Sequence, residues 1–188
     1  MPPSGHLRAD AERNVRSIIE AAIVLLAAEP EASMERVAQA AGVGRATVYR
    51  HFASREHLVR AIHDRALQDA RDAVLRTRPE EGPAHEALER VVTALLRVGD
   101  RYRLLRQVPP GDTELQARAD EVGDPMVALV ERGQRAGELR TDLPPRWLAA
   151  ALGSLAVAAL SAMIRGELSE DEAATVVCTT FVRGAVVR

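Results

Sequence analysis

The sequence contains no lysine, a single cysteine and few aromatic residues. Cys178 has no second cysteine to pair with in this chain, so no intramolecular disulfide can form, which suits a reducing compartment. All 25 basic residues are arginines, which can bind phosphate or guanine through two hydrogen bonds. Aromatic residues make up 3% of the chain, and alanine, leucine and valine supply most of the 47% hydrophobic content. Because alanine and leucine favour helices, this composition favours an all-helical globular protein.

The net charge of −2 excludes a chain that is basic over its whole surface. Residues 1–60 carry eight arginines and seven acidic residues, a net charge of +1, and residues 61–188 carry 17 and 20, a net charge of −3. Any surface for a polyanion must therefore be local. The N-terminal segment lacks the apolar run of a signal peptide, so we expect a cytoplasmic protein.

One long apolar segment needs a separate explanation. Residues 147–164 are 18 positions without a charge, which is at the lower limit for a membrane-spanning helix. Much of the segment is alanine, glycine and serine, and no cluster of positive charges in a flanking loop would orient it in a bilayer. We therefore expect no membrane association, and a helix that is buried on every side in a core or between subunits.

Helix-breaking residues divide the chain into about nine helical segments, and we find no convincing strand pattern. Ser33 and Ser54 are expected to cap two of these helices, Asp124-Pro125 is expected to kink or break another, and TRPEEGP at 77–83 is the most evident linker. The expected segments cover residues 9–28, 34–41, 45–52, 55–76, 85–99, 102–105, 113–136, 145–164 and 169–181.

Two of these segments meet at a short turn that contains glycine, Gly42-Val43-Gly44. Gly42 suits the left-handed backbone conformation that ends a helix, because it has no Cβ to clash. Val43 can then pack inward while the chain turns. Two helices joined by such a turn are what a helix-turn-helix requires, and in that motif the second helix enters the major groove of DNA.

The segment that follows the turn, RATVYRHF, has two different faces. At about 100° per residue, Val48 and Phe52 lie within about 40° of each other and define a core side. Arg45 and Tyr49 lie at the boundary, and the outward face consists of Ala46, Thr47, Arg50 and His51. Arginine suits guanine or phosphate, and hydroxyl and imidazole groups suit phosphate oxygens. An ordinary solvated helix would carry similar residues, so the phase pattern leaves both interpretations open.

Four motifs between residues 8 and 58 extend this pattern: RADA at 8–11, IIEAA at 18–22, VAxxAGV at 37–43 and TVYxHFxSRExL at 47–58. Together they resemble the DNA-binding domain of the TetR family, the tetracycline-repressor-like bacterial regulators. The length and helical layout of the remaining chain, and the loop GELRTDLP at 137–144, agree with that resemblance. The sequence departs from the family pattern at a few positions: Gly44 for a common Ser, Arg55 for a common Lys, Pro30 for a frequent Gly, and Leu25-Leu26 without the usual Phe.

The resemblance implies a homodimer whose recognition helices enter successive major grooves of a near-palindromic operator. It implies a three-helix DNA-binding domain at residues 1–56 and a larger helical bundle for ligand binding and dimerisation at residues 57–188. It places Arg45, Ala46 and Tyr49 at base edges, with Arg50 a weaker candidate for that role. The residues that it places at phosphates are Ser33, Thr47, Tyr49, His51 and Arg55.

Two further sets of residues are predicted for the larger domain. The first set would line a ligand pocket, or else form part of a plain core: Tyr102, Leu105, Met126, Leu129 and Trp147. The ligand expected for such a pocket is a small hydrophobic effector. An interface shared by two copies, or else an intramolecular core, would contain Leu152, Ala156, Leu160, Met163, Val177 and Phe181.

Motifs of catalysis, cofactor binding and metal binding are not found in the sequence. His51, His57 and His63 recur every six residues, which does not stack them on one helix face. A glycine-rich phosphate loop, a nucleophile elbow and HExxH are absent, and Cys178 is expected to be a small buried apolar residue. These absences lead us to expect no enzymatic activity, cofactor or metal, and the resemblance to the TetR family implies a ligand-released repressor. The alternative is a helical module that binds small molecules or proteins without binding an operator.

Overall fold

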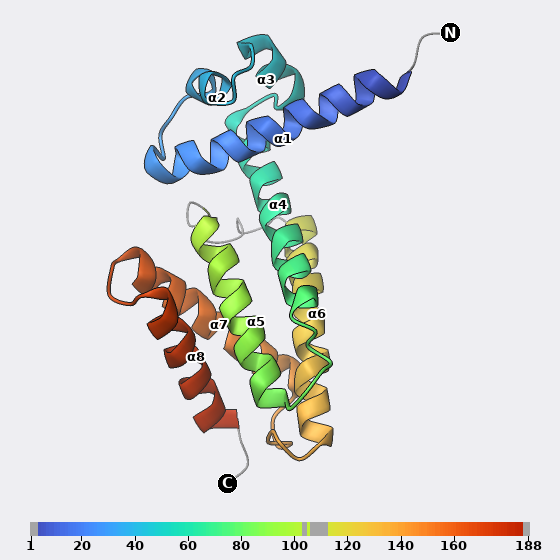
Figure 1. Ribbon diagram of the computed structural model, residues 1–188, viewed down its shortest axis with the longest axis vertical. Coiled ribbons are helices and arrows are strands. Elements are labelled where there is room, and N and C mark those ends of the chain that lie inside the picture. Colours follow the sequence, from blue (N-terminus) through green and yellow to red (C-terminus); the bar gives the residue numbers. More distant parts are fainter. Residues whose placement is uncertain (1–3, 103–104, 106–112, 186–188) are drawn as a thin grey trace. The chain divides into compact units, whose positions relative to one another are not determined.

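The computed structural model describes residues 4–102, 105 and 113–185, and within these residues the chain folds into eight α-helices (Figure 1). The predicted all-α class is thus confirmed, and half of the short helix predicted over residues 102–105 lies outside the described residues. The helices are α1 Ser4–Ala28, α2 Met34–Ala40, α3 Arg45–His51, α4 Arg55–Arg76, α5 Ala84–Arg101, α6 Thr113–Arg135, α7 Pro145–Ile164 and α8 Glu170–Ala185.

The chain forms two compact units, and the division falls within α4 after Arg65. The first unit contains α1, α2, α3 and the beginning of α4. Its helices pack through apolar side chains that are at most 6% exposed, contributed by all four segments: Ile18, Ala22, Ile23, Leu26, Val37, Ala38, Val48, Phe52, Leu58 and Ile62. This core fixes the position of α3, because Val48 and Phe52 supply its inward side.

The second unit packs α5, α6, α7 and α8 around one continuous core (Figure 1). The apolar residues of α5 recur at helical spacing, so that Leu88, Val91, Val92 and Leu96 are all buried on one side of the helix. α5 contacts α6, α7 and α8, and α7 contacts α6 and α8. The core of this unit is therefore built mainly from one face of α5 and one face of α7.

α7 is long and apolar enough to cross a membrane by length and composition, with a mean hydropathy of 2.0 in its most apolar window. One face of the helix lies in the core of the second unit, and the opposite face is exposed, with Val157 and Ile164 at its surface. The hydroxyls of Ser154 and Ser161 on that face donate to main-chain carbonyls one turn earlier, at 3.0 Å in each case. Burial on every side is thus not reached within one chain, because only one side of α7 has helices to pack against.

A kink or a break is predicted at Asp124-Pro125, and of these two the break does not occur, because α6 continues through Pro125. A proline inside a helix removes one hydrogen bond and crowds the preceding turn. Here Met126, Leu129 and Val130 follow at once and are buried in the core of the second unit. We infer that this burial outweighs the cost of the proline.

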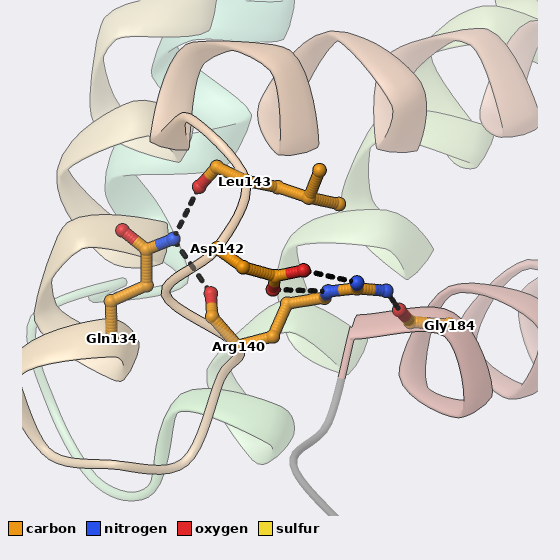
Figure 2. Close-up of polar contacts among 5 residues, drawn as sticks. All are labelled: Gln134, Arg140, Asp142, Leu143 and Gly184. Carbon is orange, nitrogen blue, oxygen red and sulfur yellow. Dashed lines mark hydrogen bonds and ion pairs between the residues drawn. The ribbon is translucent and has the colours of Figure 1, made fainter.

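The loop that joins α6 to α7 is held by polar contacts from both sides (Figure 2). The side-chain amide of Gln134 donates to the carbonyl oxygens of Arg140 and Leu143, at 2.8 and 2.9 Å. Arg140 pairs with Asp142 through two contacts of 2.7 and 2.5 Å and donates to the carbonyl of Gly184 at 2.9 Å. The hydrogen bond from Arg140 lowers the pKa of Asp142. The loop thereby ties the end of α6 to the end of α8.

Gly133 marks a close approach between α6 and its neighbours in the second unit. A Cβ at this position would lie 2.7 Å from Cδ1 of Leu139 and 2.8 Å from Cβ of Ala84. We expect Gly133→Ala to lower the free energy of unfolding by about 1–3 kcal/mol, since overpacking outweighs the better helix propensity of alanine. Urea denaturation followed by circular dichroism measures this change.

Gly123→Ala in the same helix is the matched control, because a Cβ there would have no other atom within 4 Å. We expect it to leave stability unchanged or to raise it by about 0.5–1 kcal/mol through helix propensity alone. Equal effects of the two substitutions would contradict the close packing at Gly133.

Candidate nucleic-acid interface

The turn between α2 and α3 has the backbone that a helix-turn-helix needs. Gly42 adopts a positive φ of 66°, and the amide of Val43 donates back to the carbonyl of Ala38 at 3.1 Å, which closes the end of α2. Gly44 is extended, and its carbonyl accepts the amide of Thr47 at 2.8 Å, which starts α3. At the other end of α2, the hydroxyl of Ser33 accepts the amide of Arg36 at 3.3 Å, as expected of an N-cap.

α3 presents the two faces that its sequence predicts. Val48 is fully buried and Phe52 nearly so, which confirms the core side. The exposed residues of the opposite side are Arg45, Ala46, Tyr49 and Arg50, and the half-buried ones are Thr47 and His51. The small side chain of Ala46 between two arginines leaves room for a close approach by another molecule. The exposed side of α3 thus presents cationic and hydroxyl groups around the small side chain of Ala46.

Arg45 is held in place by neighbours on α2 and α3. Its Nη2 lies 2.8 Å from Oε1 of Glu35, and its guanidinium lies 5.4 Å from the centre of the Tyr49 ring. The pKa of Glu35 is lowered chiefly by a hydrogen bond from its own main-chain amide, then by the Ser33 hydroxyl, and further by Arg45 and the Tyr49 hydroxyl. Arg50, by contrast, is exposed and has no ion pair with any described residue.

Of the residues predicted at phosphates, Arg55 is bonded within the first unit and His51 has a buried ring nitrogen. The guanidinium of Arg55 donates to the carbonyl of Ala32 at 2.5 Å and also to the carbonyl of Pro30. Arg55 therefore secures the turn between α1 and α2, and a phosphate would have to share this cation. Nε2 of His51 is buried and has no hydrogen-bond partner among the described residues. A buried donor or acceptor of this kind is uncommon in folded proteins.

The five residues predicted to line a ligand pocket lie in different surroundings. Tyr102 is buried and its hydroxyl donates to Asp69 at 2.6 Å, Leu105 is half-buried, and Met126 and Leu129 lie in the core of the second unit. Trp147, in the first turn of α7, is 58% exposed. The described contacts thus do not unite these five side chains, and their role as a pocket stays a prediction.

A groove between α5 and α8 encloses a volume of about 500 Å³ and is lined by residues that the sequence pattern does not point to: Glu89, Thr93, Asp171, Ala174, Thr175, Cys178, Thr179, Val182 and Arg183. Burial raises the pKa of the Cys178 thiol to about 11, with a further contribution from Glu89, so the thiol stays protonated at neutral pH. Cys178 is half-buried in this groove. Within the described residues, no group of three or more His, Cys, Asp or Glu side chains could hold a metal ion.

Four of the six residues predicted for an interface between two copies are buried within a single chain. Leu152, Ala156, Val177 and Phe181 are at most 6% exposed in a single chain and belong to the core of the second unit. They therefore fill the intramolecular core, which is the alternative that their sequence pattern allows. Leu160 and Met163 are half-buried against the same core. The large apolar residues that α7 and α8 leave exposed are Trp147, Val157, Ile164 and Val176.

Comparison with known proteins places the first unit in a family. Residues 18–62 match the family model described as bacterial regulatory proteins, tetR family. The HTH-type transcriptional repressor LfrR of Mycolicibacterium smegmatis is 38% identical over 138 residues, which cover 72% of this chain and 71% of LfrR. The HTH-type transcriptional regulator NfxB of Pseudomonas aeruginosa is 25% identical over 175 residues, 89% of this chain and 92% of NfxB.

The likeness extends to the fold of the whole chain. The crystal structure of LfrR in complex with proflavine superposes with a TM-score of 0.77 and 30% sequence identity, over 94% of this chain and 99% of that one. The helix-turn-helix, the all-helical second unit and these relatives lead to one conclusion. The chain belongs to the TetR family of bacterial regulatory proteins, and it is a DNA-binding transcriptional regulator.

Proposed function

We propose that the protein represses transcription as a homodimer on a near-palindromic operator and leaves the operator when a small molecule binds its second unit. The observation that carries the proposal is the exposed surface of Arg45, Ala46, Tyr49 and Arg50 on the second helix of a helix-turn-helix. Similarity to LfrR, which is described as a repressor, favours repression. The same similarity disfavours a helical module that binds no operator. Such a regulator acts in the bacterial cytoplasm, where the chromosome is.

In this proposal α3 enters the major groove and its residues divide the contacts. Arg45, Ala46 and Tyr49 face base edges, with Arg50 beside them, because residues near the start of a recognition helix reach the bases. The phosphate contacts come from Ser33, Thr47, Tyr49, His51 and Arg55. The exposed and unpaired guanidinium of Arg50 can also neutralise a phosphate directly, since no ion pair within the described chain competes for it.

The proposed homodimer uses the exposed faces of α7 and α8 rather than their buried faces. Val157, Ile164 and Val176 are each about half-exposed, and the intervening hydroxyls of Ser154 and Ser161 are bonded within α7. This face therefore offers apolar area and small residues with few unsatisfied polar groups. A two-fold arrangement would bring the same face of a second copy against it, and would set the two α3 helices about 34–36 Å apart for successive grooves.

The proposed domain roles are DNA binding for residues 1–56 and ligand binding with dimerisation for residues 57–188. α4 contributes to both compact units, so it is the element through which a ligand could alter α3. LfrR has been crystallised in complex with proflavine, which supports a small-molecule effector for this chain as well. We propose a largely hydrophobic effector, and Tyr102, Leu105, Met126, Leu129 and Trp147 remain the candidates for contacting it.

Substitution of the two exposed arginines of α3 tests the groove assignment. Arg45→Ala and Arg50→Ala are each expected to weaken operator binding by about 1–3 kcal/mol, since each removes a base or phosphate contact. Fluorescence anisotropy with an operator duplex selected from a random pool measures the change. Arg146→Ala, which removes an exposed arginine of the second unit, is the control and should leave operator affinity within about two-fold of the unmodified protein. If both α3 variants bind the operator as the control does, the groove assignment is wrong.

A further inference from the structure

Three side chains that are predicted to contact DNA meet at one carboxylate of their own chain. Glu35, in the first turn of α2, pairs with Arg45 at 2.8 Å, and Arg45 in turn lies over the ring of Tyr49 at 5.4 Å. The hydroxyls of Ser33 and Tyr49 also help to lower the pKa of this carboxylate. A phosphate that approached Arg45 would therefore compete with the carboxylate of Glu35 for its guanidinium. Nothing in the sequence pattern singles Glu35 out, because its partner Arg45 lies beyond the turn.

This cluster does little for the stability of the fold. The side chains of Glu35 and Arg45 are 45% and 67% exposed, and an ion pair that is so exposed contributes little net free energy in water. A carboxylate on a surface that meets a polyanion also repels the phosphates. Glu35 thus adds little to the stability of the free protein and opposes the binding of DNA in general. Its contribution is therefore sought in the choice between DNA sequences.

We propose that Glu35 is a positioning residue that sets DNA specificity, by keeping Arg45 from phosphates and directed along the edge of α3. The proposal rests on operator binding by α3. On DNA of arbitrary sequence, a phosphate has to displace the carboxylate from Arg45 or tolerate its charge. On the operator, Arg45 can bind a guanine edge through two hydrogen bonds, and this compensates for the loss of the Glu35 contact. Glu35 therefore weakens binding to random DNA more than binding to the operator.

Glu35→Gln isolates the charge, because the amide has nearly the same shape and its oxygen still accepts hydrogen bonds. We expect its affinity for a random duplex to rise by about five-fold, with a smaller change for the operator, so that the ratio of the two affinities falls. We also expect the slope of log affinity against log salt to become steeper by about one, since the freed Arg45 neutralises one more phosphate. A merely structural role would leave this slope unchanged.

Glu31→Gln is the matched control. Glu31 is an exposed glutamate that precedes α2 in the same unit, and it has no ion pair with any described residue. Its substitution removes the same charge without freeing Arg45, so we expect an affinity change of less than about two-fold and an unchanged salt slope. A second test places Glu35→Gln in an Arg45→Ala background, where its effect on random DNA should shrink to that of Glu31→Gln.

The experiment titrates the four variants and the unmodified chain with operator and random duplexes at several salt concentrations. It decides whether Glu35 sets DNA specificity through Arg45. The inference is overturned if Glu35→Gln matches Glu31→Gln in affinity and slope, or if its effect persists without Arg45. If the inference fails in this way but the unmodified chain binds the operator, the proposed function still holds and only the role of Glu35 is lost. Absence of any duplex binding by the unmodified chain would remove both.

Discussion

Truncation of Phe181 to alanine is expected to lower the free energy of unfolding by about 3–5 kcal/mol. Phe181, on α8, is only 5% exposed and packs in the core that α5, α6, α7 and α8 share. Alanine would remove most of the ring and leave a cavity, and both losses add to the cost. Urea denaturation at several protein concentrations measures it and separates folding from association.

Leu75→Ala provides the control for this truncation. Leu75, on α4, is 51% exposed, so its truncation should change stability by no more than about 0.5 kcal/mol. A Phe181→Ala protein that kept full stability and lost only its self-association would return Phe181 to the interface between copies. That outcome would also contradict the burial of its three companions, Leu152, Ala156 and Val177.

Val157→Arg is expected to give a folded chain that no longer forms a dimer and binds its operator at least about 100-fold more weakly. Val157 is 51% exposed on the face of α7 that we propose as the interface. In a two-fold interface each substitution appears on both sides, so arginine would place two cations in an apolar contact. The loss of operator affinity follows because two linked recognition helices bind far more tightly than one.

Leu75→Arg makes a comparable exchange at a position with the same 51% exposure but on α4. Sedimentation equilibrium should find this control dimeric and the Val157→Arg protein monomeric, while circular dichroism should find both equally helical. A Val157→Arg protein that stays dimeric would mean that copies associate through another face.

Local signals in the sequence predict most of the helix boundaries. Ser169 and Glu172 form a capping box, with the amide of Ser169 donating to Glu172 at 2.8 Å and the amide of Glu172 donating back to Ser169 at 3.4 Å. Gly42 ends α2 with a positive φ, and Ser33 caps the start of that helix. These features depend on residues within four positions of each other, so they can be recognised from the sequence alone.

The partners of side chains across the fold could not be predicted in the same way. An apolar residue such as Leu152 is predicted to be buried, but its sequence context does not say whether its own chain or a second copy covers it. Arg55 fits a phosphate contact by its motif, yet in the fold it donates to carbonyls 23 and 25 residues away. Glu35 is one of two charged residues on a short helix, and its contact with Arg45 appears only when α3 packs beside α2.

The most direct test of the central claim is the selection of duplexes from a random pool by the unmodified protein, followed by titration of the enriched sequence against salt. We expect a near-palindromic sequence whose half-sites lie about one helical turn apart, with log affinity falling linearly against log salt. With about 6–10 phosphate contacts, affinity should fall by at least about 10³-fold between about 50 and 200 mM salt. A pool that yields no enriched sequence, together with affinity that salt does not change, would contradict the assignment of α3 as a DNA-reading helix.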